Sequence, residues 1–430
     1  MRHFSLRSSW SPWLLLAVCA VTVAVYWPGL HGAFLFDDYP NIVDNHGVQP
    51  HDASVPSLVR AALSSPSSEF KRPLASLSFA ANYLAAGLNP YWMKLTNLLI
   101  HLLNGLLVFW LARALMRAAD CCDGGTYVAT PACADTRTIG IAAALVAGAW
   151  MLLPINLTGV LYVVQRMESM ANAFVLLGLI GYVAGRRHML APPPASAALQ
   201  AAAHSSAVHA ESMPERTKHP SRRGFILCVM SVTLPALFGI LAKETAVMLP
   251  LYAVLIEWAL FRFRTPLAAV PRPDQAPAAA APSRADRRLI VLFALVLVLP
   301  IIAGLAWLLP HLLRPSAWAT RDFTMGTRLL SEARIVVDYI AWTLLPTPDA
   351  LSFYHDDFRV STGLLSPWTT LACMLVLAAV VAFDVWVRKR QPLVALGIAL
   401  FLGCQLLTGT ILPLELIYEH RNYFASFGLM

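Results

Sequence analysis

The chain has 430 residues, and its composition excludes an ordinary soluble domain. Hydrophobic residues make up 58% of it, charged residues only 13%, and the mean hydropathy is +0.61. The apolar residues fall in long runs, which indicates an all-α polytopic membrane protein. The net charge of +8 is spread over short segments between these runs. It therefore reports membrane topology and gives no support to nucleic-acid binding.

The apolar runs predict a bundle of about ten transmembrane helices. The first run follows Arg2 and Arg7 and resembles a signal peptide, but the later spans and the lack of a clear small-residue cleavage site favour a retained anchor. In chain order the runs are about Pro12–Leu30, Trp92–Met116, Thr138–Leu153, Ser169–Gly185, Phe225–Leu241, Ala246–Phe261, Leu289–Leu309, Pro367–Val387, Pro392–Leu412 and one beginning near Tyr423.

The segment Arg328–Leu345 is ambiguous, because it is apolar but contains Glu332, Arg334 and Asp338. If it crossed the membrane, the basic cluster that begins at Arg388 would lie outside, against the positive-inside rule. We therefore expect this segment to be an interfacial or re-entrant helix.

This topology, with a cytoplasmic amino terminus, divides one membrane module (1–430) into loops on two sides. External loops are expected at 31–91 and 310–366, and most of the acidic residues fall on that side. The cytoplasmic loops at about 187–223 and 264–287 are rich in Ala and Pro and are expected to be disordered.

An acid pair, Asp37 and Asp38, directly follows the first span. Two carboxylates beside a bilayer are costly, which suggests a catalytic site. One of them can take the proton of an acceptor hydroxyl or orient a bound group. The alternative is a solvated Asp-Asp turn that caps a helix.

Four cations on the external side are candidates for binding an anionic head group: Arg72, Arg166, Lys243 and Arg421. Guanidinium forks in particular suit phosphate oxygens. The plainer alternative for Arg72 is anchoring at the membrane interface. For Arg166 it is a local ion pair with Glu168, and for Lys243 a local ion pair with Glu244. Arg421 opposes the positive-inside trend, so we expect an internal acid or a phosphate as its partner.

Asn97, His101 and Asn104 recur at spacings of four and three in the second span. They share one helical face, which predicts a buried, hydrogen-bonded seam toward the bundle interior. The cysteine spacing predicts neither a disulfide framework nor a zinc knuckle, so no metal ligand is assigned. The sequence does not indicate whether activity depends on a divalent metal. Nucleotide-binding and hydrolase motifs are also missing from the sequence.

Several strings resemble, in order along nearly the whole chain, the membrane module of the TMTC-type protein O-mannosyltransferases and their bacterial relatives. The strings are FDDYPNI at 36–42, RPLxxLSFxxNY at 72–83, LTNLLIHLLN at 95–104, QRMESM at 165–170, AKETAVMLP at 242–250 and YEHRNY at 418–423. This family belongs to the GT-C superfamily of membrane glycosyltransferases, so the resemblance implies a GT-C-like bundle.

The resemblance also implies an activity and a set of roles. A hexose, with mannose as the candidate, would pass from a polyprenyl-phosphate donor to an acceptor hydroxyl, with protein Ser or Thr the leading acceptor. Asp37 or Asp38 would be the general base, with Asp38 preferred, while the four cations would hold the donor phosphate. No resident cofactor is assigned. The implied location is a bacterial inner membrane, with membrane lipids around the bundle and the site facing the periplasm.

Further site candidates lie close to these groups in the sequence or in the second external loop. Those in the loop have a solvated surface as their plainer alternative. The candidates are Glu244, His355, Asp356, Asp357, Glu419 and His420.

One departure from the family keeps the acceptor open. The chain shows no 34-residue helical repeat, whereas TMTC-like proteins commonly continue into tetratricopeptide repeats. The chain is then either truncated or recognises its acceptor elsewhere, and a glycan or lipid acceptor stays possible. A transporter or flippase of lipid-linked sugar, and a noncatalytic scaffold, are the rival classes.

Overall fold

A computed structural model describes residues 10–120, 136–190, 219–265, 285–353, 355 and 357–430. These residues form α-helices, short 3-10 and π segments and connecting loops, and no named β-strand occurs among them. The prediction of an all-α polytopic membrane protein is confirmed.

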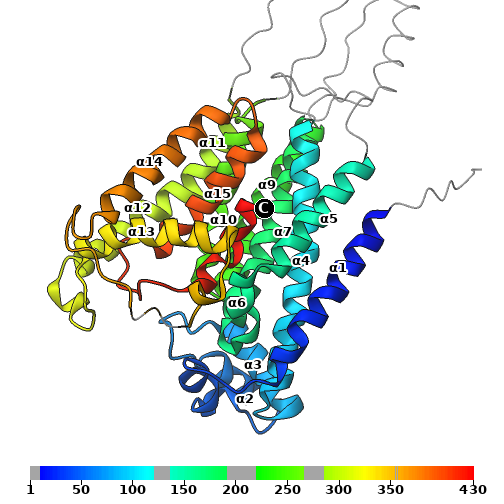
Figure 1. The fold of residues 1–430 in the computed structure, drawn as a ribbon. Helices are drawn as coiled ribbons and strands as arrows, with labels where there is room; N and C mark the ends of the chain where they lie inside the picture. Colours follow the sequence, from blue (N-terminus) through cyan, green and yellow to red (C-terminus); the bar gives the residue numbers. More distant parts are fainter. Residues whose placement is uncertain (1–9, 121–135, 191–218, 266–284, 354, 356) are drawn as a thin grey trace, which may run out of the picture.

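Two groups of helices lie side by side (Figure 1). The first group consists of α1 (Trp10–Tyr26), α4 (Pro90–Asp120), α5 (Thr136–Leu152), α7 (Arg166–Leu190) and α9 (His219–Ile240). The second consists of α10 (Leu249–Ile256), α11 (Arg287–Phe293), α12 (Leu299–Leu312), α14 (Thr369–Val387) and α15 (Pro392–Thr408).

Among the described residues, seven helical segments are long and apolar enough to cross a membrane, and an eighth is formed if the bent pair Thr136–Leu152 and Pro154–Leu161 counts as one span. The pair bends by 58° at Pro154, where proline removes a helix donor. Helix α15 is apolar but has only 17 residues. The segment expected to begin a last span near Tyr423 is instead α16 (Asn422–Ala425) followed by a 3-10 turn, both packed in the core. The described spans are thus fewer than the predicted ten.

Small residues let α7 and α9 approach closely. A Cβ added to Gly178 would lie 2.7 Å from the Ser231 carbonyl oxygen, and one added to Gly224 would lie 2.8 Å from the Gly185 carbonyl oxygen. Close backbone approach of this kind is typical of membrane helix pairs, because packing there replaces the hydrophobic driving force.

The predicted polar seam on α4 is confirmed. The His101 Nδ1 forms a hydrogen bond with the Tyr423 hydroxyl at 2.7 Å. Its Nε2 lies 3.0 Å from the Met151 carbonyl oxygen. The Asn97 amide donates to the Val160 carbonyl, and the Asn104 amide donates to the Ser169 carbonyl. The seam ties α4 to four other segments of the chain through side chains that are fully buried.

The acid pair and two helices of the first predicted external loop lie at one end of the bundle. These helices are α2 (Val55–Ala62) and α3 (Pro73–Ala86), and they lie at the opposite end from the Asp120 end of α4 (Figure 1). Helix α13 (Met325–Leu344) covers the ambiguous segment and runs across the second group of helices. It is not among the seven spanning segments of the described structure, because four charged residues interrupt its apolar sequence. Which end faces the cytoplasm stays a prediction.

Candidate active site

The Asp38 carboxylate anchors the turn that carries the acid pair. It is fully buried, and it accepts hydrogen bonds from the backbone N–H of Leu35 at 3.0 Å and of Val164 at 2.7 Å. Phe36, within the same turn, has a left-handed backbone with φ of 36°, which costs a non-glycine residue free energy. The Asp38 bonds stabilise this strained turn against the start of α7.

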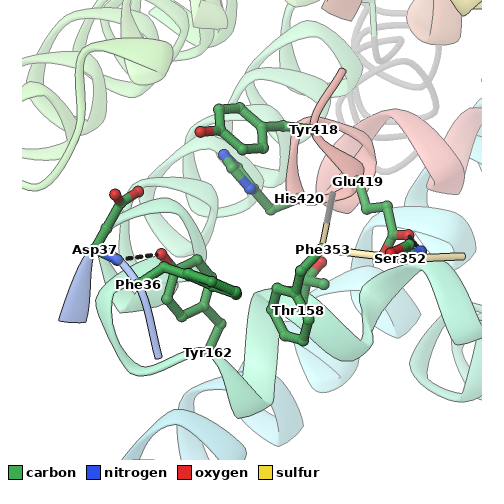
Figure 2. Close-up of a pocket in the computed structure, with 9 residues that line it drawn as sticks. All are labelled: Phe36, Asp37, Thr158, Tyr162, Ser352, Phe353, Tyr418, Glu419 and His420. Carbon is green, nitrogen blue, oxygen red and sulfur yellow. Dashed lines mark hydrogen bonds between the residues drawn. The ribbon is translucent and has the colours of Figure 1, made fainter. Parts of the chain in front are cut away.

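Asp37 points the other way. Its backbone N–H donates to the Tyr162 hydroxyl at 2.7 Å, and its exposed carboxylate points away from that ring toward Tyr418 and His420 (Figure 2). The structure therefore reverses the preference for Asp38 as the base, because Asp38 is committed to backbone donors and Asp37 is open to a ligand. The alternative of a solvated turn is also wrong for Asp38, whose side chain neither meets solvent nor caps a helix.

The burial of Asp38 predicts a pH-dependent stability. Burial raises the pKa of Asp38 to about 6, although the backbone donors and Lys94 oppose the shift. The resulting contribution to folding is complete below about pH 4 and is lost as the pH rises through about 6, a difference of up to about 3 kcal/mol. Asp38→Asn cannot ionise. We expect its unfolding temperature, relative to the wild type, to increase between pH 4 and pH 7 in detergent, and a constant difference would contradict this assignment.

A cavity of about 640 Å³ opens beside Asp37, within the size range of pockets for small ligands. Its charged lining comes from loops and helix starts, and its apolar lining from the helices behind them. The polar part includes Asp37, Arg72, Glu168, Lys243, Glu244, His420 and Arg421. The apolar part includes Val175, Met248, Tyr252, Cys404, Leu407 and Phe424.

Helix α7 shows how the lining changes along the cavity. Glu168 lies in its first turn, and Val175 lies about two turns further along, a rise of roughly 10 Å. The cavity thus leads from charged groups at the end of the bundle to an apolar wall between α7, α10 and α15. An amphipathic ligand, with an anionic head and an apolar tail, fits this gradient.

Two of the cavity cations form ion pairs across it. Arg72 pairs with Glu244 at 2.8 Å, and Lys243 pairs with Glu168 at 3.0 Å. The predicted local pair of Lys243 with Glu244 is therefore wrong, because these neighbours point to different partners. Burial lowers the pKa of Lys243, although Glu168 opposes this. An anionic ligand would have to share these cations with the carboxylates.

Arg421 is the cavity cation with no carboxylate at ion-pair distance among the described residues. Its Nη1 donates to the Leu416 carbonyl at 2.9 Å and its Nη2 to the Glu415 carbonyl at 2.7 Å. The guanidinium also lies 5.2 Å from the centre of the Tyr418 ring. A guanidinium has five N–H groups, so donors remain for a ligand. The expected internal acid partner is thus not found in the part of the chain that the structure describes, and a phosphate is left as the second expectation.

The two residues before Arg421, Glu419 and His420, also lie close to Asp37. His420 is buried, and burial together with the neighbouring Lys243 and Arg421 holds its pKa well below its usual value, so the ring is neutral at neutral pH. The Glu419 carboxylate accepts the Ser352 backbone N–H at 2.6 Å. Both residues line the space beside Asp37.

Arg166 does not reach the cavity, which corrects the prediction that it binds the donor phosphate. It is fully buried, and its guanidinium donates to the Asn97 side chain at 2.7 Å and to the carbonyls of Ser78 at 3.0 Å and Met93 at 2.8 Å. The alternative, a pair with Glu168, is wrong too, since that acid pairs elsewhere. Arg166 instead connects α7 to α3 and α4.

Arg166→Met should therefore act on stability. The substitution removes three hydrogen bonds that a buried charged group makes to α3 and α4, and we expect a loss of roughly 2–5 kcal/mol in the free energy of unfolding. Thermal unfolding in detergent, followed by tryptophan fluorescence, measures this, with Arg60→Met on the exposed side of α2 as the control. An unchanged unfolding temperature with weakened donor binding would return Arg166 to the phosphate role.

Two of the candidates in the second loop, His355 and Asp357, are described, and neither lines the cavity. The His355 ring stacks on Trp342 with ring centres 4.8 Å apart, and its Nε2 lies 3.8 Å from the Glu419 carboxylate. Asp357 is exposed and does not line the cavity. Asp356 lies outside the described residues.

Four residues of the site carried no prediction from the sequence. Tyr418 lines the cavity next to the Glu-His-Arg string, so its position could have suggested it. Thr158, Tyr162 and Phe353 surround Asp37 from two other segments. Their types and spacing are those of ordinary core and loop residues, and no sequence signal distinguishes them.

The fold and site together define a helical membrane protein with an exposed acid at the mouth of an amphipathic cavity. Over part of its length the chain is similar to proteins named protein O-mannosyl-transferase. Tmtc3 of Drosophila melanogaster is 26% identical over 172 residues, which cover 39% of this chain and 18% of that protein. TMTC3 of Mus musculus is 28% identical over 170 residues, and that of Homo sapiens is 26% identical over 170, each covering 38% of this chain and 16% of the relative.

The matched stretch spans less than a fifth of these relatives. No protein-family model and no solved structure matches the chain.

Proposed function

We propose that the chain is a GT-C-type glycosyltransferase that moves a hexose from a polyprenyl-phosphate donor to a hydroxyl group at the extracytoplasmic face of the membrane. The observation that carries the proposal is the position of the Asp37 carboxylate beside a cavity whose lining changes from charged to apolar. In a bacterial inner membrane this face is the periplasmic one. The names of the relatives favour mannose as the sugar and a protein as the acceptor.

The cavity suits a lipid-linked donor better than a nucleotide sugar. The apolar wall of the cavity includes Val175, Tyr252 and Leu407. It would bury isoprenoid units, whereas it offers a nucleotide no polar partners. The phosphate would bind near Arg421, which offers unused N–H donors, and next to the paired Arg72 and Lys243. The sugar would then lie between the phosphate and Asp37.

The chemistry follows from this order of groups. Asp37 takes the proton of the acceptor hydroxyl as its oxygen attacks the anomeric carbon, and the bond from that carbon to the phosphate oxygen breaks. The lipid phosphate leaves with a negative charge that Arg421 stabilises. A single displacement of this kind inverts the anomeric configuration. Asp38 acts indirectly, by fixing the turn that presents Asp37.

Transfer by the purified full chain in nanodiscs tests the proposal. Radiolabelled polyprenyl-phosphate mannose, polyprenyl-phosphate glucose and GDP-mannose are each offered with a peptide that contains Ser and Thr, and with the same peptide in which both are Ala. We expect label on the hydroxyl peptide from a lipid donor and none from the nucleotide sugar. Transfer from GDP-mannose alone, or movement of the lipid donor across a liposome membrane without transfer, would refute the proposal.

A further inference from the structure

A small pocket of about 60 Å³ lies beside Asp37 (Figure 2). It shares Asp37, Tyr418 and His420 with the larger cavity. Asp37 therefore lines two spaces of very different size. A group bound in the small pocket and a group bound in the larger cavity can both contact its carboxylate.

Aromatic rings close the small pocket on one side. The Phe353 ring centre lies 5.8 Å from that of Phe36 and 5.6 Å from that of Tyr162, the latter at 90°. These are favourable edge and tilted contacts. They join the connection before α14 to the acid-pair turn and to the segment before α7, so the wall is built from three parts of the chain.

Thr158 lines the small pocket and carries a buried hydroxyl group. Thr158 is only 5% exposed, and its hydroxyl has no hydrogen-bond partner within the described structure. A buried hydroxyl without a partner costs free energy. Thr158 belongs to the pocket lining, so a small rotation of its side chain would let a hydroxyl or water in the pocket satisfy this oxygen.

The size of the pocket limits what can enter. At roughly 10–15 Å³ for each water-sized group, it accommodates about four to six non-hydrogen atoms. The side chain of serine or threonine fits with its Cα, whereas a hexose ring or a phenol does not. A ligand of this size with a hydroxyl group would meet Thr158 and Asp37 together.

We propose that this pocket receives the acceptor side chain, that the Thr158 hydroxyl helps to orient it, and that Phe353 determines specificity by limiting its size. This inference rests on the proposed transfer reaction and adds the place and the size limit of the acceptor. The hydroxyl oxygen is held between Thr158 and Asp37, which receives its proton, while the sugar donor occupies the larger cavity.

Competition between acceptor peptides tests the size limit. Peptides that carry serine, homoserine or tyrosine at one position are offered to the wild type, Phe353→Ala, and Phe358→Ala as a control from the same loop that does not line the pocket. Homoserine has no more side-chain atoms than threonine and should be accepted, whereas a phenol exceeds the pocket volume, so the wild type should prefer serine over tyrosine by at least about 10-fold. Phe353→Ala should reduce that preference about 10-fold, and Phe358→Ala should leave it unchanged.

A second pair of variants keeps the test decisive if Phe353→Ala does not fold. Phe353→Leu should show a smaller shift of the same sign. Thr158→Val keeps the shape but removes the hydroxyl, and we expect its kcat/KM for serine peptides to fall roughly 10-fold while the donor KM stays constant.

The outcomes separate the two proposals. If the wild type transfers to serine but none of these variants changes the preference or the acceptor kcat/KM, the pocket assignment is overturned and the transfer function stands. If the wild type transfers to no peptide from any lipid donor, the proposed function itself fails and this inference fails with it.

Discussion

Asp37→Asn should reduce sugar transfer by about 100- to 10,000-fold, the usual contribution of a positioned general base. Asparagine has nearly the same shape but cannot accept the acceptor proton. The turn should persist, because it depends on the Asp38 carboxylate and on the Asp37 backbone N–H, which the substitution leaves in place. Initial rates at saturating lipid donor, with the glycosylated peptide counted by mass spectrometry, measure the loss.

Asp44→Asn is the matched control, since Asp44 is an exposed acid in the same segment and lines neither space beside Asp37. It should transfer at the wild-type rate. Donor affinity and unfolding temperature should be the same in Asp37→Asn and in the wild type. A rate for Asp37→Asn within about twofold of the wild type would remove Asp37 from the mechanism.

Arg421→Gln should weaken binding of the lipid donor roughly 10- to 100-fold. A hydrogen bond to a charged group contributes about 1.5–3 kcal/mol, and Arg421 is the cavity cation that has no carboxylate at ion-pair distance in the described structure. The dissociation constant for polyprenyl-phosphate mannose, measured by displacement of a fluorescent analogue, reports the effect. This dissociation constant should rise with ionic strength, and it should rise less steeply in the variant than in the wild type.

Arg321→Gln provides the control for damage to the loop. Arg321 donates to the Pro413 carbonyl at 2.9 Å and pairs with Glu415 at 2.8 Å, so it supports the same segment as Arg421 but does not line the cavity. Equal losses of donor affinity in the two variants would mean that Arg421 acts only through loop structure.

The helices were predictable because membrane spans need long apolar runs, and hydropathy reports those directly. The run Trp92–Met116 and the helix Pro90–Asp120 agree to within a few residues. The polar seam was predictable for a similar reason, since Asn97, His101 and Asn104 follow helical periodicity. The bend between Leu152 and Leu161 was not predicted, because a proline shows where a helix breaks but not the direction in which the chain continues.

The partners of the charged residues could not be predicted, because they come from distant parts of the chain. Arg166 bonds to carbonyls 88 and 73 positions away, at Ser78 and Met93, and a buried guanidinium held by carbonyls has no sequence signature. Which of Asp37 and Asp38 is open to a ligand could not be predicted from the sequence either. It depends on the left-handed backbone of Phe36 and on a donor at Val164.

A structure of the protein with a phosphonate analogue of polyprenyl-phosphate mannose would test the central claim most directly. Our account predicts the phosphonate at Arg421, the lipid against Val175 and Tyr252, and the anomeric carbon close enough to Asp37 for one hydroxyl group to lie between them, each contact within roughly 3–3.5 Å. Density for the analogue at the opposite end of the bundle, or in this cavity with its sugar turned away from Asp37, would contradict it.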